Sequence, residues 1–149
     1  MIKKRVSRDT PLAEITLRKY EKPSSNDKRD IVKKICLSLG LLQPGDSRDV
    51  VVDILQVVLE TRESLSSEDI KDKAVENRKK YNLALNGIAP SNVRRQIKRL
   101  KDMFLIEKIG NEYRINENED LVTIFNEKIK KFYVEPSIER IKEYLEMVK

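Results

Sequence analysis

Hydrophobic side chains recur at helical spacing over much of this chain, and the clearest stripe lies between positions 90 and 104. Val93, Ile97 and Leu100, followed by Phe104, fall on one side of a helix that turns by about 100° per residue. This stripe predicts a helix laid on a core, and Pro90 suits its first turn because no N–H is needed there. The other sides carry long polar side chains: Ser91, Asn92, Arg94, Arg95, Gln96, Lys98, Arg99 and Lys101.

After Leu105 the spacing changes from helical to alternating. The runs 106–109 and 112–115 each alternate, and Gly110 and Asn111 separate them. This pattern predicts two short strands joined by a tight turn, a β-hairpin. Lys108 and Arg114 would then stand on the hairpin, close in sequence to the basic helix.

Three more helices are predicted upstream. The run 27–39 repeats Ile31, Val32, Ile35, Cys36 and Leu39 at helical spacing, and Gly40 follows as a stop. The run 48–62 is apolar on nearly every side, so it is expected to be buried on more than one side. Ser66 is a cap for a helix over about 67–81, because Glu68 and Asp69 follow where the helix dipole favours negative charge.

Residues before position 27 have weaker patterns. Residues 1–9 are basic and have little to bury, which indicates an arm. Thr10 and Pro11 resemble a cap and first turn, and predict a short helix that ends near Tyr20. The alternation of Ile15 and Leu17 leaves a strand open as well. Residues 22–26 are expected to form a loop.

The last thirty residues hold two further apolar stripes. Leu121, Ile124, Phe125, Ile129 and Phe132 predict one helix, and Pro136 with Ser137 is expected to end it. A final helix would then carry Ile138, Ile141, Leu145 and Val148 on one side. These stripes need a partner, and we expect a second copy of the chain to cover at least one of them, because a two-fold interface needs only one self-complementary patch.

Composition narrows the possible chemistry. The 149 residues carry a formal charge of +6, which favours polyanionic partners. There is no histidine and one cysteine, Cys36, so we expect no disulfide within the chain, no thiolate or imidazole metal site and no histidine-base catalysis. The four glycines are scattered singly and make no phosphate-binding loop, and we expect no cofactor, no metal and no enzymatic activity. Cys36 is expected to be a core residue. No apolar run has the length of a membrane span, and no signal peptide is evident, so an intracellular protein without membrane contact is expected.

A basic amphipathic helix followed at once by a small hairpin resembles the recognition helix and wing of winged helix-turn-helix domains. The run APSNVRRQIKRLKD and the following FLIEKIGNEYRI are most similar to the archaeal transcriptional regulators of that superfamily. The resemblance covers about residues 48–116. It implies a mainly α fold with a small β-hairpin wing and extra helices at both ends. The domains would be residues 1–26 (basic arm and short element), 27–116 (winged-helix domain with a preceding helix and a core at 48–116) and 117–149 (helical extension for dimerisation).

The resemblance also implies a function, namely sequence-specific binding of double-stranded DNA by a homodimeric, nucleoid-associated regulator in the cytoplasm. Arg94, Arg95 and Lys98 would reach guanine edges or phosphates, and Asn92 or Gln96 would pair with adenine. Ser91, Arg99 and Lys101 would lie along the same helix, and Lys108 and Arg114 would contact the DNA backbone. Two alternatives stay open. The basic side could be ordinary solvated surface, or the domain could bind protein in a chromosome-organising or transcription assembly.

Overall fold

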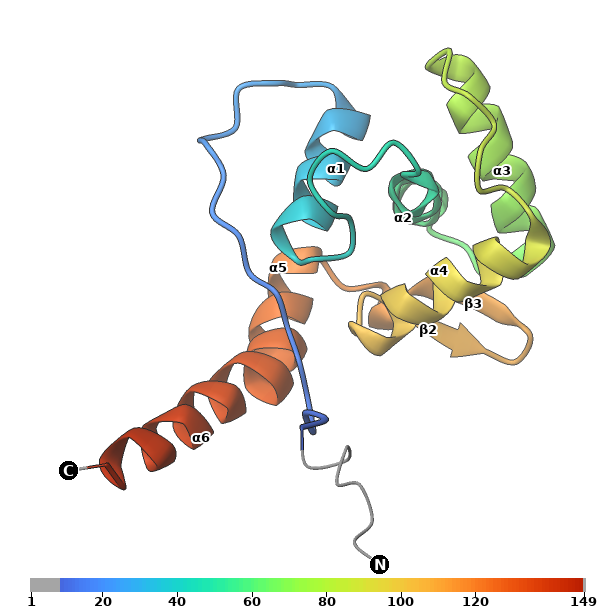
Figure 1. Ribbon diagram of the computed structural model, residues 1–149. Helices are drawn as coiled ribbons and strands as arrows, with labels where there is room; N and C mark the ends of the chain where they lie inside the picture. Colours follow the sequence, from blue (N-terminus) through green and yellow to red (C-terminus); the bar gives the residue numbers. More distant parts are fainter. Residues whose placement is uncertain (1–8, 149) are drawn as a thin grey trace, which may run out of the picture.

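The computed structural model describes residues 9–148 and consists mainly of helices with one small antiparallel sheet (Figure 1). The expected combination of helices and a hairpin is confirmed, whereas the arm at residues 1–8 lies outside the described residues. The elements, in chain order, are α1 (Lys28–Ser38), α2 (Val50–Thr61), β1 (Leu65–Ser66), α3 (Ser67–Lys80), α4 (Pro90–Asp102), β2 (Ile106–Ile109), β3 (Glu112–Ile115), the 3-10 turn η2 (Asn116–Asn118), α5 (Leu121–Ile124), the π-helix η3 (Phe125–Val134) and α6 (Glu135–Glu146).

Helix α2 is the centre of the fold, and α1, α3 and α4 pack around it (Figure 1). Every residue from Val50 to Val58 is buried. This burial follows from the sequence, because a helix that is apolar on all sides is stable only when other elements surround it. Each buried apolar side chain of Val or Leu size contributes about 1.5–3 kcal/mol before entropy costs, so α2 supplies much of the stabilising burial.

The sheet joins the hairpin to the start of α3. Strands β2 and β3 pair as predicted, with Ile106 opposite Ile115, and β1 adds to the other edge of β3 through Leu65 opposite Tyr113. Strand β1 has two residues, too few for alternation to be recognised in the sequence. Ser66, at its end, caps α3, and its hydroxyl accepts a 3.0 Å hydrogen bond from the Asp69 N–H. The hairpin and α3 are therefore held together by one short strand.

Residues 10–26 form no helix, so the helix predicted from Thr10 to Tyr20 is wrong; no strand forms there either. The segment is instead extended along the end of α1, and Leu12 remains 96% exposed. Its anchor is Arg18, whose N–H donates to the Ser38 carbonyl at 2.9 Å. The Arg18 guanidinium also donates to the carbonyl of Leu37 at 2.7 Å. A short isolated helix is marginal in water, and these bonds to the open end of α1 favour the extended form.

Helices α5, η3 and α6 follow one another without interruption, so the predicted break at Pro136 and Ser137 is also wrong. Proline is tolerated here because the preceding ten residues form a π-helix, whose i→i+5 bonds rearrange the ladder ahead of the ring. The Ser137 hydroxyl donates to the Tyr133 carbonyl at 2.6 Å and satisfies an acceptor near the proline. Ile124 and Ile129 enter the same core as α2, whereas the apolar residues of α6 are exposed.

The prediction that Phe104 continues the buried stripe of α4 is wrong. Phe104 lies beyond the helix end and has a φ of 65°. Its left-handed conformation ends the helix, and the next N–H, from Leu105, donates to the Leu100 carbonyl at 3.1 Å. The ring of Phe104 lies 5.5 Å from that of Phe132 and 5.7 Å from that of Tyr133. These contacts tie the junction of α4 and β2 to η3.

Candidate nucleic-acid interface

Helix α4 is fixed by the side that it buries. Val93, Ile97 and Leu100 are almost fully buried and pack against α2 and α3. Pro90 occupies the first turn of the helix, as predicted. Because one side is locked into the core, the opposite side is held facing solvent, and β2 follows within a few residues.

Five of the predicted residues of α4 are exposed: Ser91, Arg94, Arg95, Lys98 and Lys101. Four of these are cations. Lys98 Nζ lies 2.8 Å from Asp102 Oδ2 in an exposed ion pair, a kind of contact that contributes little to stability and exchanges easily. Within residues 9–148, Arg94 and Lys101 make no ion pair or side-chain hydrogen bond. The outer side of α4 therefore presents four cations, two of them without a partner in the described part of the chain.

Asn92 is held by the chain itself. Its amide donates to the Gly87 carbonyl at 2.7 Å. Its Oδ1 accepts from Arg95 Nη2 at 2.8 Å and from Gln96 Nε2 at 3.2 Å. The loop before α4 thus positions Asn92, and Asn92 in turn positions one end of the Arg95 guanidinium.

Gln96 and Arg99 point along the flank of α4 rather than outward. Arg99 Nη1 donates to Gln96 Oε1 at 2.7 Å, and Arg99 Nη2 donates to the Gly40 carbonyl at 3.4 Å. Both side chains are half-buried. These two side chains and Asn92 are therefore the predicted residues of α4 that are both half-buried and hydrogen-bonded within the chain.

The hairpin carries one exposed cation, Lys108, which makes no ion pair or side-chain hydrogen bond within the described residues. Arg114 is half-buried, and its Nε donates to Glu107 Oε2 at 2.7 Å. Burial acts to raise the pKa of Glu107, but the Glu117 N–H and Arg114 outweigh it and hold that pKa below its ordinary value. Glu107 is therefore a lasting counter-charge for Arg114, and Lys108 is the available cation of the hairpin.

A buried ionic cluster fixes α1 and α3 against α2, and sequence reasoning missed it. Asp53 is fully buried in the middle of α2. Arg29 Nε lies 3.0 Å from Asp53 Oδ1, and Arg78 Nη1 lies 2.7 Å from Asp53 Oδ2. Asn77 Nδ2 also donates to Asp53 Oδ1, at 2.8 Å. The one signal in the sequence was a carboxylate inside the most apolar helix, which needs cationic partners in the core.

Asp49 extends the same cluster and accepts from Arg78 Nη1 at 2.9 Å. Burial acts to raise the pKa of Asp49, but the hydrogen bonds and charges of Arg78 and Arg29 outweigh it, and the pKa is lowered. Arg78 Nε also donates to the Ala84 carbonyl at 2.6 Å and so holds the loop that leads to α4. Because Arg78 is buried, it serves the interior of the fold and does not add to the exposed cations.

Within residues 9–148, no three His, Cys, Asp or Glu side chains are grouped so that they could hold a metal ion. Cys36 is buried in the core, and burial raises the pKa of its thiol to about 12. Among the helices of the described residues, none combines the length and apolar character needed to cross a membrane. Comparison of the chain with models of protein families, with curated proteins and with solved structures gave no match.

Proposed function

We propose that this chain binds double-stranded DNA as a winged helix-turn-helix protein, with α4 as the recognition helix and β2–β3 as the wing. The order α2, β1, α3, α4, β2 and β3 is the order of elements in a winged-helix domain. The sheet order β1-β3-β2 supports this assignment, because the strand between the first two helices pairs with the second strand of the wing. The extra helix α1 and the α5–η3–α6 helix lie outside that unit.

The observation that carries the proposal is the side of α4 opposite the core, where Arg94, Arg95, Lys98 and Lys101 are all exposed. The major groove of B-DNA admits one helix, and long cationic side chains reach its phosphates and base edges. Lys108 adds a cation on the hairpin that follows. The exposed cations thus lie on one side of α4 and on the adjacent strand β2. This arrangement suits contact with a DNA groove and its flanking backbone.

Arg95 is the residue best suited to read a base. Arginine recognises guanine through two parallel hydrogen bonds to O6 and N7, so the orientation of its guanidinium matters. The 2.8 Å bond from Arg95 to Asn92 restricts that orientation before DNA is met. Arg94, Lys101 and Lys108 have no such restraint, and Lys98 has only an exposed ion pair with Asp102. These four cations fit the role of phosphate contacts, which position a protein without reading sequence.

The test is titration of a labelled duplex at several salt concentrations. If about five cations per subunit meet phosphates, log K falls with log salt at a slope of roughly −4 to −5 per subunit. Replacing both Arg94 and Lys101 by Gln should reduce the slope by about two. The matched control is replacement of Lys79 and Lys80, which are exposed at the end of α3, and it should change the slope less.

Absence of duplex binding at low salt would contradict the proposal. The counter-charges Asp102 and Glu107 beside Lys98 and Arg114 would then favour the second candidate, a winged-helix module that binds protein through the same face. A second test is to isolate the genomic DNA fragments that the protein binds. If the protein is a sequence-specific regulator, these fragments should share a sequence motif. An inverted repeat in that motif would indicate the homodimer that we propose, since two recognition helices of a two-fold dimer meet half-sites about one DNA turn apart, roughly 34 Å.

A further inference from the structure

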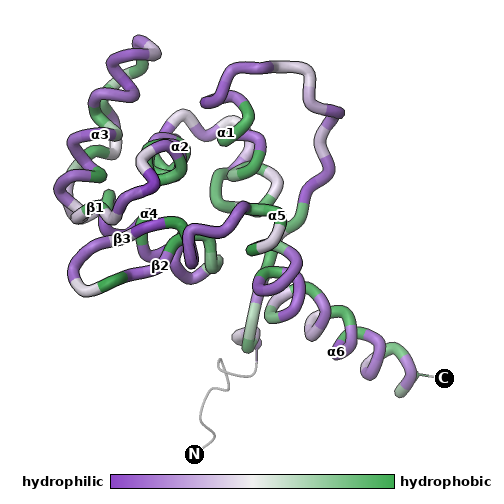
Figure 2. The backbone as a smooth tube through the Cα atoms, turned by 180° about the vertical axis from the view of Figure 1, so that it is seen from behind, coloured by the Kyte–Doolittle hydropathy of each residue, from purple (hydrophilic) through white to green (hydrophobic). Residues whose placement is uncertain are grey.

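Helix α6 carries an apolar stripe that nothing in the described chain covers. Ile138, Ile141 and Leu145 are each about half exposed or more, and Leu145 reaches 66%. Their spacing of three and then four residues is the spacing by which helices pack side by side. Figure 2 shows hydrophobic residues recurring along α6 where it projects away from the helices around α2. A helix end of this kind frays in water unless a partner buries its stripe.

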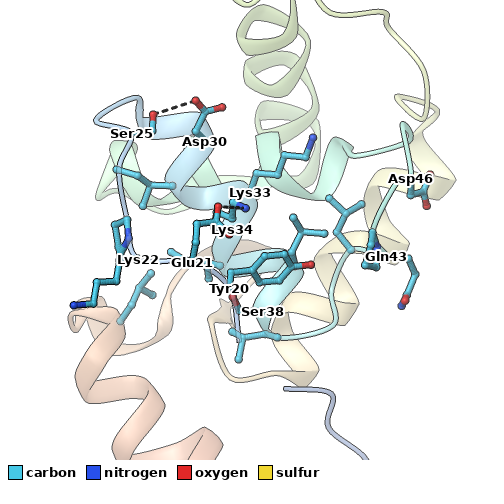
Figure 3. A pocket seen from close by; sticks show the side chains of 18 of the residues that line it. Tyr20, Glu21, Lys22, Ser25, Asp30, Lys33, Lys34, Ser38, Gln43 and Asp46 are labelled. Carbon is cyan, nitrogen blue, oxygen red and sulfur yellow. Dashed lines mark hydrogen bonds and ion pairs between the residues drawn. The ribbon is translucent and has the colours of Figure 1, made fainter. Parts of the chain in front are cut away.

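An apolar groove of about 1230 Å³ lies beside α5 and the first half of η3, the helical segments that lead into α6 (Figure 3). Ile31 and Ile35 line it from α1, and Val122, Phe125 and Ile129 line it from α5 and η3. Val122 is 70% exposed on this wall. The segment 20–25 borders the groove, where Lys34 Nζ pairs with Glu21 Oε1 at 2.6 Å. The groove is thus an open apolar surface with polar edges.

The groove and the stripe of one chain cannot meet each other. Helices α5, η3 and α6 are continuous, and α5 with η3 forms a wall of the groove. Helix α6 leads away from that wall (Figure 1). It could turn back only if the helix broke.

The π-helix brings the groove wall and the stripe onto one side of this long helix. Ile138 follows Val122 by 16 residues, and in an α-helix of about 100° per residue it would lie about 160° away, nearly opposite. The i→i+5 bonds of a π-helix lower the rotation to about 80° per residue. Over ten residues, the π-helix therefore turns by roughly half a turn less than an α-helix would. Ile138, Ile141 and Leu145 therefore return to the side of Val122 and Phe125.

We propose that two copies of this chain pair their 121–146 helices antiparallel, so that α6 of each copy lies in the groove between α1 and α5 of the other. One register places the exposed Val122 opposite Leu145. A two-fold axis near the middle of the helix then covers both grooves and both stripes at once.

The charges of the two halves of the helix agree with this pairing. Residues 121–134 hold three lysines and one glutamate, a net +2. Residues 135–146 hold four glutamates, one arginine and one lysine, a net −2. Antiparallel pairing sets the basic half of each helix beside the acidic half of the other, which favours this orientation over a parallel one.

Sedimentation of the full chain without DNA tests the pairing independently of the proposed DNA binding. The wild type should be a dimer, and Leu145→Asp and Val122→Asp should each weaken the dimer at least about tenfold, because each buries a charge in an apolar contact. Met147→Asp is the matched control: Met147 is exposed but lies about 200° around the helix from Leu145, so its variant should stay dimeric. Circular dichroism of the monomeric variants should show the wild-type fold.

Cross-linking tests the register. Under oxidation, the double variant Val122→Cys with Leu145→Cys should form a covalent dimer, and Leu145→Cys alone should not; Cys36 is buried and should not take part. A monomeric wild type would overturn the inference. So would a Val122→Asp variant that remains as dimeric as the wild type, since the contact would then lie between the two α6 helices alone. A dimer that binds no duplex would leave this inference standing and remove the proposed function.

Discussion

Arg78 Nη1 lies 2.7 Å from Asp53 Oδ2, with the side chains of both residues almost completely buried. The two residues are 25 positions apart and join α3 to the centre of α2. A buried pair of this kind is costly to break, because the remaining charge stays in the core without its partner.

Replacing Arg78 by alanine should therefore lower the free energy of unfolding by about 3–5 kcal/mol. That loss is large beside the roughly 5–15 kcal/mol total of an ordinary domain. Denaturant unfolding measures it. Lys79→Ala is the control, since Lys79 is exposed at the next position and should change stability by less than about 0.5 kcal/mol. Equal losses in the two variants would show that the cluster contributes no more than surface charge.

The same cluster predicts a dependence of stability on pH. The folded-state pKa of Asp49 is lowered, since Arg78 and Arg29 outweigh the effect of burial. A carboxylate with a lowered folded pKa stabilises the protein above its unfolded pKa of about 3.9, and this contribution is lost as pH falls through the folded pKa. We expect wild-type stability to fall steeply below about pH 4. Asp49→Asn should be less stable at neutral pH and should lose less on acidification.

Unfolding by denaturant at a series of pH values checks this prediction. Asp72→Asn is the control, because Asp72 is exposed on α3 and makes no ion pair or side-chain hydrogen bond within the described residues. Its curve should run parallel to that of the wild type. A curve for Asp49→Asn that is also parallel to the wild type would show that acid acts on other groups.

Asn92 should matter for specificity through Arg95. On the preferred DNA site, Arg95→Ala should cost about 1–3 kcal/mol, with a smaller loss on random duplex. Asn92→Ala removes the 2.8 Å bond that restrains Arg95, so it should show the same pattern with a smaller loss. Lys101→Ala should instead weaken both DNAs about equally, because a phosphate contact carries no sequence information. Titrations with the two duplexes measure these differences. If Asn92→Ala weakened binding to both duplexes equally, Asn92 would have no role in positioning Arg95.

The packing of the extended segment on α1 can be tested at two glycines. Gly40 and Gly45 both have positive φ values, 73° and 81°, so alanine at either costs about 1–2 kcal/mol. A Cβ at Gly40 would lie 2.5 Å from the Cβ of Thr16, whereas a Cβ at Gly45 would meet nothing within 4 Å. Gly40→Ala should thus cost about 1–3 kcal/mol more than Gly45→Ala in thermal or denaturant unfolding.

The second half of this test is a double-mutant cycle. Thr16→Gly should remove the additional cost of Gly40→Ala, because it removes the atom that a new Cβ would meet. If Gly40→Ala and Gly45→Ala are equally destabilising, residues near Thr16 do not lie against the end of α1 in solution.

Local patterns in the sequence were sufficient for the hairpin and for the buried side of α4. The turn at Gly110 and the alternation of 106–109 and 112–115 depend on neighbouring residues alone, and the structure pairs those residues. The side of α4 that faces solvent also follows from the spacing of Val93, Ile97 and Leu100. The exposed Arg94, Arg95, Lys98 and Lys101 could therefore be predicted from the sequence.

Only the tertiary structure decided which polar residues have partners far away in the sequence. Arg99 meets the Gly40 carbonyl from 59 positions away, and Arg78 meets Asp53 across two helices, so no local period reveals either contact. The N-terminal segment is extended because Arg18 forms hydrogen bonds to the end of α1. The local helix propensity of the segment carries no information about that contact. The side of the helix on which the α6 stripe lies depends on a ten-residue π-helix. Each residue of the π-helix turns slightly less than a residue of an α-helix, and over ten residues the difference adds up to about half a turn. Contacts between distant residues and accumulated rotation are properties of the folded chain, and sequence periodicity records neither of them.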